Sequence, residues 1–193
     1  MKIKKDFYKV SALELAPKLL GLNLVHNTKE GITKGKIVEV EAYMGTKDKA
    51  AHAYSGIPTK RTKPMFGEAG HSYVYLIYGM YYCMNVVANK VGKAEAVLIR
   101  ALEPIEGIEL MNNRREGKVL KQLCSGPGKL CIAMGINKAN NEMDLSGNQL
   151  YIEDPKEKEE FVVEKSKRIN IDYAQEAKDY LWRYTIKDSK FLS

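Results

Sequence analysis

The chain has 193 residues, 45% of them hydrophobic, and a formal net charge of +7. This length suits one domain with a substantial core, and the excess of positive charge favours a polyanionic partner, most commonly nucleic acid. We expect neither a signal peptide nor a membrane span, because no run approaches 18 apolar residues. Three cysteines without a CxxC pair favour a reducing, cytosolic compartment over a disulfide framework.

The first third of the chain predicts a helix followed by two strands. Ser11 and Glu14 have the spacing of a capping box, and Gly21 is a natural stop. The expected elements are a helix over 12–20, bent or shortened by Pro17, and strands over 22–27 and 32–43, joined by a turn at 29–31.

The second of these strands carries two carboxylates. In IVEVEAY (37–43), alternation places Glu39, Glu41 and Tyr43 on one face, opposite a valine and alanine face that is typical of core. One interpretation is a solvated face on which both glutamates pair with lysines. The other is a carboxylate held rigidly beside an aromatic side chain, which suits a general base.

Residues 44–72 form a long connection, which in a compact domain is usually functional or disordered. One or two helical turns are expected over 48–53, with His52 on them. The stretch 58–64 is a basic loop with two prolines, and its cations and threonines could position a phosphate backbone. The alternatives are a structural histidine and an ordinary solvated loop.

The segment YVYLIYGMYYCMN (73–85) contains five tyrosines. Alternation before Gly79 and a second extended segment, 82–88, predict a β-hairpin with residues 78–81 at or near its tip. Hairpin tips are usually polar because they lie in water. Large apolar groups at this tip therefore indicate insertion into a partner, and the net charge favours nucleic acid as that partner.

The second half of the chain predicts alternating short elements. Arg100 interrupts an apolar strand, so it either snorkels from an edge or faces a site. The Gly-rich turn 125–128 is either a phosphate site at a helix N-terminus or a tight turn between helices. The expected elements are strands over 94–102, 150–153, 161–163 and 182–186, helices over 104–116, 129–134 and 173–179, a turn at 90–93, and a solvated charged surface over 154–168.

Four segments carry a resemblance to a known family. They are VEVEAYMGTKDKAAHAYSG (38–56), YVYLIYGMYYCMN (73–85), LIRALEPIEG (98–107) and CSGPGKLCIAMGIN (124–137). In this order they resemble the alkyladenine DNA glycosylase family, also called 3-methyladenine or methylpurine DNA glycosylase, of the mammalian type. The resemblance implies a single compact α+β domain over residues 1–193. A curved, mainly antiparallel sheet would be surrounded by helices, and a β-hairpin would project into the DNA minor groove.

The resemblance also implies roles for individual residues. Glu41 matches the general base that activates water against the sugar C1′. The substrate-base pocket would comprise Tyr43 as one wall, His52 and Tyr75 as the opposite wall, Asn85 crowding the 2-amino group of guanine, and Arg100 near the catalytic water and the DNA backbone. Tyr78 matches the intercalating tyrosine, and Met80 and Tyr81 match tip residues that lie against DNA. For Lys60, Arg61 and Lys63, in the variable basic loop, we predict backbone contact only.

The implied activity is base-excision repair of double-stranded DNA. The enzyme would flip alkylated or deaminated purines (3-methyladenine, 7-methylguanine, hypoxanthine, ethenoadenine) out of the duplex and hydrolyse the N-glycosidic bond, leaving an abasic site. No metal or other cofactor is expected, because the three histidines are scattered and no HExxH motif is present. No lysine is placed for a Schiff base, which predicts a monofunctional enzyme without lyase activity. We also expect a cytoplasmic monomer.

Two alternatives stay open. LCSGPGKLCIAMGI (123–136) resembles a helix-hairpin-helix turn, and Asp144 downstream would then be the catalytic acid. That reading leaves the tyrosine hairpin and the EAY strand without a role. The second alternative is a non-catalytic DNA-binding protein that uses the hairpin as a wedge.

Overall fold

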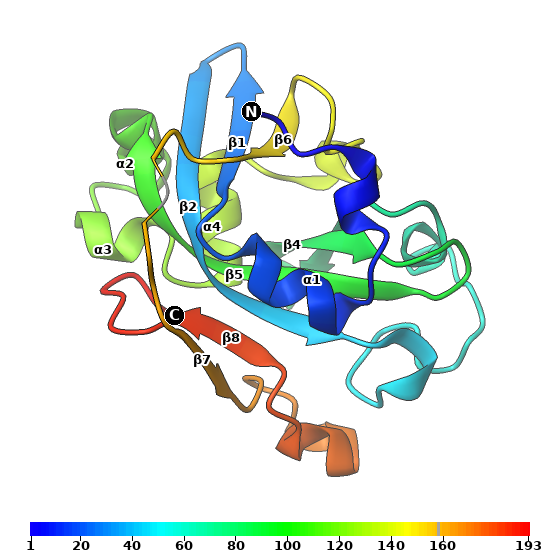
Figure 1. Ribbon diagram of the computed structural model, residues 1–193. Coiled ribbons are helices and arrows are strands. Elements are labelled where there is room, and N and C mark those ends of the chain that lie inside the picture. Colours follow the sequence, from blue (N-terminus) through cyan, green and yellow to red (C-terminus); the bar gives the residue numbers. More distant parts are fainter. Residues whose placement is uncertain (158) are drawn as a thin grey trace.

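The computed structural model describes residues 1–157 and 159–193 (Figure 1). Eight strands form one sheet in the order β3-β4-β5-β2-β1-β6, while β8 pairs with the second half of β2 and with β7. All the pairings are antiparallel. The strands are β1 (Asn23–Thr28), β2 (Gly31–Tyr43), β3 (Ser72–Ile77), β4 (Tyr81–Ala88), β5 (Glu95–Glu106), β6 (Leu150–Glu153), β7 (Val163–Ser166) and β8 (Arg183–Ile186).

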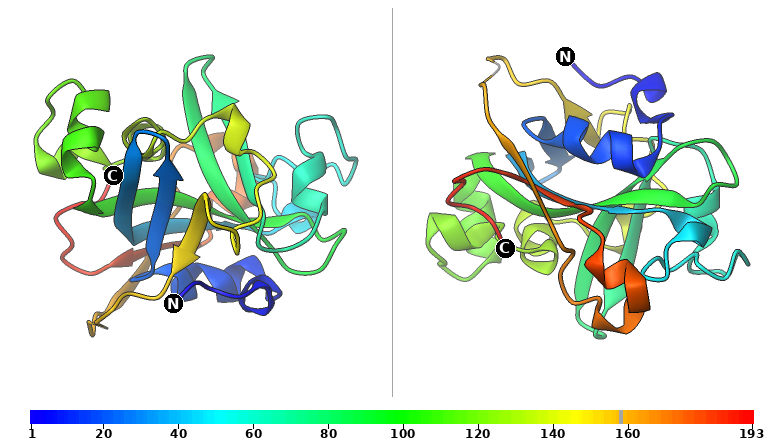
Figure 2. Two further views of the ribbon diagram at one scale, coloured as in Figure 1. Left: turned by 90° about the horizontal axis from the view of Figure 1, so that it is seen from above. Right: turned by 60° about the horizontal axis from the view of Figure 1, so that its bottom comes forward.

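Short helices surround this sheet. In Figures 1 and 2, α1 lies on one face of the central strands and α4 on the opposite face. The α-helices are α1 (Ala12–Leu19), α2 (Ile108–Arg114), α3 (Leu120–Leu123) and α4 (Pro127–Met134). The 3₁₀ helices are η1 (Lys5–Tyr8), η2 (Gly45–Lys47), η3 (Lys63–Phe66), η4 (Lys138–Asn140) and η5 (Asp172–Asp179). None of these helices is long and apolar enough to cross a membrane.

The central strands β2 and β5 are buried over most of their length. Their apolar side chains belong to the main hydrophobic core, in which Ile37, Ile99 and Leu102 are fully buried. The pairing of β2 with β5 shifts register on both sides of Glu39. Such bulges bend a strand and re-aim its side chains, so regular alternation fails at the part of β2 that carries the glutamates.

The predicted fold class is confirmed: a mainly antiparallel sheet with surrounding helices in a single compact domain. The predicted helix over 12–20 is present as α1, with the Ser11 hydroxyl accepting a hydrogen bond from the Glu14 N–H at 3.3 Å. The β-hairpin is present as β3 and β4 with residues 78–80 between them. In both views of Figure 2 this hairpin projects beyond the rest of the sheet.

The prediction that Pro104 begins a helix is wrong. Pro104 lies in β5 and is paired with Gly35, while α2 begins only after Gly107. Proline is tolerated there because β4 pairs with β5 only as far as Leu98, which leaves this end of β5 with an open edge. Gly107 allows the sharp turn, with a φ of 72° and Ile32 O only 2.1 Å from where a Cβ would stand.

Other elements also differ from the prediction, and three of them bear on the site or its surroundings. Residues 48–53 form turns without a helix. The strand expected over 161–163 is displaced to β7, because pairing with β8 sets its limits. The helix expected over 173–179 is the 3₁₀ helix η5, interrupted where Gln175 has a φ of 51°.

Gly45 anchors the connection that follows β2. Its φ is 58°, and an added Cβ would lie 2.4 Å from Lys93 O, whereas Gly92 has a similar φ of 86° but nothing within 4 Å. We expect Gly92→Ala to lower the free energy of unfolding by about 1 kcal/mol and Gly45→Ala by about 3 kcal/mol, because only the latter adds a backbone clash. Urea unfolding of both variants measures the difference, and equal losses would contradict the close approach at Gly45.

Candidate active site

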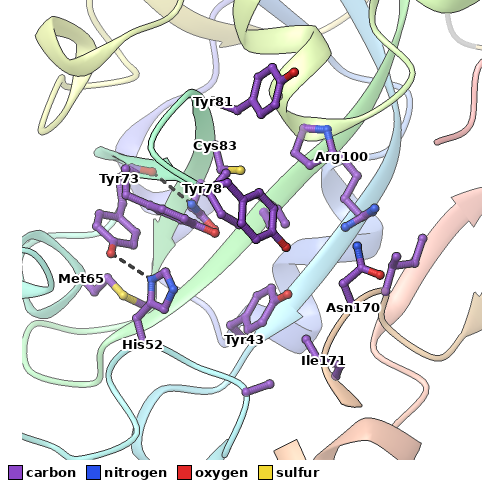
Figure 3. A pocket seen from close by; sticks show the side chains of 18 of the residues that line it. Tyr43, His52, Met65, Tyr73, Tyr78, Tyr81, Cys83, Arg100, Asn170 and Ile171 are labelled. Atoms are coloured by element: carbon purple, nitrogen blue, oxygen red, sulfur yellow. Dashed lines mark hydrogen bonds between the residues drawn. The ribbon is translucent and has the colours of Figure 1, made fainter. Parts of the chain in front are cut away.

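A cavity of about 390 Å³ opens between the hairpin, the end of β2, the first half of β5, and the segment that leads into η5. Six tyrosines and a histidine line it, together with Asn85 and Arg100. Figure 3 shows Tyr73 and His52 on one side of this cavity and Arg100 and Asn170 on the other. The site is therefore largely aromatic, with a few polar groups, as is usual for pockets that orient a planar ligand.

The structure brings most of the sequence-predicted residues together. Seven line the cavity, namely Tyr43, His52, Tyr75, Tyr78, Tyr81, Asn85 and Arg100. Glu41 lies behind the cavity wall, and Met80 stands at the hairpin tip with 66% of its surface exposed. Lys60 and Lys63 are exposed on the predicted basic loop, while the Arg61 guanidinium lies over the Tyr75 ring.

Glu39 and Glu41 are both fully buried, so the interpretation as a solvated face paired with lysines is wrong. Their partners include arginines: Arg100 Nε donates to Glu39 Oε1 at 2.9 Å, and Arg100 Nη1 lies 3.4 Å from Glu41 Oε1. At Glu39 the face is covered by the side chain of Arg183, which comes from the neighbouring strand β8, and by Ser193. Buried carboxylates require such partners, since an unpaired charge in the interior is costly.

The two glutamates differ in their remaining partners. Glu39 also accepts hydrogen bonds from Arg183 Nε at 2.7 Å and from the Ser193 N–H at 2.7 Å. Burial alone raises the pKa of Glu39, but these hydrogen bonds and the charges of Arg183 and Arg100 hold it below its usual range. Glu39 therefore fixes Arg100 in place and does not face the cavity.

Glu41 is bonded to the cavity wall itself. Its Oε2 accepts a hydrogen bond from the Tyr43 hydroxyl at 2.8 Å, and its Oε1 accepts one from the Ile169 N–H at 2.8 Å. Tyr43, Ile169 and Arg100 all line the cavity. Among the residues that the structure describes, no carboxylate lines it directly, and Glu41 stands immediately behind three of its lining groups.

The wall opposite Tyr43 is an aromatic cluster. The His52 ring lies edge-on to Tyr75 at 4.5 Å between centroids, and His52 Nδ1 is 3.1 Å from the Tyr73 hydroxyl. Burial of the ring, with the charge of Arg61 nearby, lowers the pKa of His52 to about 4, so the imidazole is neutral at pH 7. Asn85 also lines the cavity and is fixed there, because its amide donates to Tyr73 O at 3.1 Å.

The sequence reasoning missed the contribution of the segment before η5. Ile169, Asn170 and Ile171 line the cavity together with Tyr173 of η5, although the sequence assigned no site role to them. Residues 154–168 were expected to be a solvated surface, and Arg168 contradicts that expectation because its side chain is fully buried. The local sequence offers one sign that this segment is buried, the two isoleucines on either side of Asn170. The residues that the segment contacts, such as Glu41 and Ala50, lie more than a hundred residues earlier in the chain.

Arg168 joins this segment to the loop that follows β2. Its Nη1 and Nη2 donate to the two carboxylate oxygens of Asp48 at 2.5 and 2.8 Å. Its guanidinium also lies over the rings of Tyr43 and Trp182, at 4.7 and 5.0 Å from the centroids. One buried arginine thus positions both the Tyr43 wall and the neighbouring lining residues.

The Gly-rich turn lies at the cavity, whereas Asp144 lies away from it. Pro127 and Gly128, in the Gly-rich turn, line the cavity next to Tyr81, whose Cβ is 3.0 Å from where a Gly128 Cβ would stand. Asp144 does not line the cavity, and Lys5 holds it at 3.0 Å. The helix-hairpin-helix alternative with Asp144 as the acid is therefore wrong. Among the described residues, no group of three or more His, Cys, Asp or Glu could hold a metal ion.

An aromatic cavity beside an exposed aromatic hairpin tip, with a carboxylate and an arginine behind it, is typical of enzymes that act on nucleic-acid bases. Comparison with known proteins agrees: residues 6–190 match the family described as methylpurine-DNA glycosylase (MPG). The chain belongs to the methylpurine-DNA glycosylase family. It is therefore a DNA glycosylase, an enzyme of DNA repair that acts on N-glycosyl bonds with DNA as its substrate. The resemblance seen in the sequence is confirmed, and the alternative of a non-catalytic wedge protein is not supported.

Relatives match along the whole chain. A protein of Clostridium acetobutylicum is 54% identical over 201 residues, covering 100% of this chain and 98% of the relative. Proteins of Alkaliphilus oremlandii and Clostridium perfringens are 52% and 47% identical, covering 100% of this chain and 99% of each relative. All three have the name "Putative 3-methyladenine DNA glycosylase".

The Asp48–Arg168 pair should matter for stability. Asp48→Ala leaves a buried guanidinium without its carboxylate, so we expect the free energy of unfolding to fall by about 3 kcal/mol. Asp179→Ala is the matched control, because its pair with Lys167 is exposed, and should cost at most about 0.5 kcal/mol. Urea unfolding measures both, and similar small losses would show that the buried pair does not hold the loops together.

Proposed function

We propose that the protein excises alkylated or deaminated purines from double-stranded DNA. The substrates are 3-methyladenine, 7-methylguanine, hypoxanthine and ethenoadenine. The damaged nucleotide flips into the aromatic cavity, where a water activated by Glu41 hydrolyses the N-glycosidic bond and leaves an abasic site. One observation carries this proposal: the cavity lies between the exposed Tyr78 at the hairpin tip and the buried Glu41–Arg100 pair. A wedge, a base pocket and a carboxylate thus meet at one place.

The hairpin tip supplies the wedge. Tyr78 is 74% exposed and has a φ of 52°, in a turn closed by the Met80 N–H donating to Ile77 O at 3.2 Å. Flipping a nucleotide costs a few kcal/mol, and a ring that stacks in the vacated space offsets part of that cost. Met80 and Tyr81, which are 66% and 41% exposed, would lie against the neighbouring base pairs and sugars.

The cavity selects the base. Tyr43 forms one wall and Tyr75 with His52 the other, so a planar purine would stack between π faces. Asn85 would crowd the 2-amino group of normal guanine. Its amide is held by the Tyr73 carbonyl, so it cannot move aside without losing a buried hydrogen bond.

The chemistry needs a base and a stabiliser of positive charge. Glu41 takes a proton from water while the water oxygen bonds to C1′, and the carboxylate charge stabilises the oxocarbenium-like sugar. Arg100 sits between Glu41 and the cavity, where it would hold the water and a DNA phosphate. Among the described residues no lysine lines the cavity, which supports a monofunctional enzyme without a Schiff-base lyase step.

The remaining expectations stay predictions. Lys60, Arg61 and Lys63 are exposed on one loop and would contact phosphates. The monomeric state, the cytoplasmic location and the extent of the glycosylase domain over residues 1–193 also stay predictions.

Glu41→Gln tests the general base. We expect single-turnover excision of hypoxanthine from a labelled duplex to fall by about 10²- to 10⁴-fold while binding is retained, because the amide cannot accept the water proton. Glu164→Gln is the control at an exposed glutamate and should leave excision unchanged. In the wild-type protein we expect the labelled strand to break only after alkali treatment, which cleaves DNA at an abasic site. Full activity of Glu41→Gln would exclude Glu41 as the base, and breakage without alkali would reveal a lyase step.

Tyr78→Ser tests the wedge. Loss of the stacking ring should weaken flipping by about tenfold, since base–aromatic stacking contributes roughly 1–3 kcal/mol. The measurement is the fluorescence change of a base analogue at the lesion position on binding. Tyr54→Ser, at an exposed tyrosine outside the cavity, is the matched control. An unchanged fluorescence response in Tyr78→Ser would show that the tip does not support flipping.

A further inference from the structure

Each aromatic wall of the cavity has an arginine against it. Arg168 lies over the Tyr43 ring at 4.7 Å, and Arg61 lies over the Tyr75 ring at 5.0 Å from the centroid. The two cations differ in their surroundings. Asp48 neutralises Arg168, whereas Arg61 forms no ion pair with a carboxylate among the described residues. The positive charge beside the Tyr75 wall is therefore uncompensated.

The charge of Arg61 acts on groups that line the cavity. Arg61 is not one of the cavity-lining residues, yet its charge contributes, after burial, to lowering the pKa of His52, which does line the cavity. It acts in the same direction on the Tyr73 hydroxyl, lowering a pKa that burial raises. A base stacked on Tyr75 would occupy the same region as these two groups.

We infer that Arg61 is a specificity-determining residue that favours neutral damaged purines over cationic ones. The inference rests on the proposed function and deepens it, because it names the charge class of the preferred substrate. A cation already stacked on Tyr75 draws on the negative π face that would otherwise attract a cationic purine. It also repels such a purine directly.

The bond-breaking step amplifies this preference. When the C1′–N9 bond breaks, its electron pair leaves with the purine, and water supplies a hydroxyl group to C1′ while Glu41 takes the water proton. For a neutral purine this proton ends, in sum, on the departing base, whereas for a cationic purine it ends in solvent. A neutral purine such as hypoxanthine therefore develops negative charge as it departs, and Arg61 stabilises that charge. A cationic purine such as 7-methylguanine departs neutral, so Arg61 disfavours its bound form and gives no such help to its departure.

The experiment compares two lesions in one duplex sequence. Single-turnover excision of hypoxanthine and of 7-methylguanine is measured against enzyme concentration, giving a maximum rate and a half-saturation concentration for each. With Arg61→Gln, the maximum rate for hypoxanthine should fall by about three- to tenfold, a range that allows for solvent screening of an exposed charge. The half-saturation concentration for 7-methylguanine should fall relative to that for hypoxanthine, because loss of a phosphate contact would affect both duplexes equally. Arg61→Lys, which keeps the charge, should retain most of the wild-type ratio.

Lys60→Gln is the matched control, because it removes an exposed charge from the same loop away from the Tyr75 ring. It should change the half-saturation concentration for both lesions equally. If Arg61→Gln behaves in the same way, Arg61 is a phosphate contact only and the inference is overturned. Absence of excision in the wild-type protein would overturn the proposed function itself, whereas intact excision with an unchanged lesion ratio in Arg61→Gln overturns only the inference.

Discussion

Two buried carboxylates, two residues apart on β2, impose the main constraint on this structure. Glu39 and Glu41 are fully buried, and each needs charged or hydrogen-bonding partners to offset the loss of water. Those partners come from four other parts of the chain, namely Arg100 on β5, Arg183 on β8, the Ile169 N–H and the Ser193 N–H. The carboxylates can therefore be buried only when β5, β8 and the segment before η5 are in place. The site and the fold that surrounds it form together.

The aromatic walls of the cavity also depend on charged partners. Arg168 contacts Asp48 and the Tyr43 ring at once, so a single buried ion pair stabilises the fold and orients a wall of the cavity. Arg61 contacts the other wall without a neutralising carboxylate among the described residues. The first arrangement serves stability, while the second leaves a charge free to act on whatever stacks against Tyr75. Chemically similar residues thus have different consequences because their counter-ions differ.

Local sequence signals were sufficient where the structure depends on neighbouring residues. The capping of α1 by Ser11, the β1–β2 hairpin and the tyrosine hairpin all follow from spacing and alternation over a few residues. Local signals failed where a distant partner decides. Pro104 is a good helix start, yet pairing of β5 with β2 keeps it extended. The sequence of residues 154–168 predicts a solvated surface, yet Arg168 is buried because it pairs with Asp48. That partner lies 120 residues earlier in the chain, beyond the reach of any local signal.

The sequence by itself determined the family, the fold class and the identity of most candidate site residues, because these depend on motifs and on residue type. Residue alternation alone could not distinguish the two glutamates, and only the resemblance to the family singled out Glu41. Alternation places Glu39 and Glu41 on the same face, and in the tertiary structure Arg100 contacts both of them. Their other partners separate them: Glu39 is bonded to Arg183 and Ser193, whereas Glu41 is bonded to two groups of the cavity wall. Nor could the sequence place Asn170 at the cavity or Arg61 over Tyr75. Such positions depend on contacts between segments far apart in the chain, and these contacts exist only once the sheet has brought the segments together.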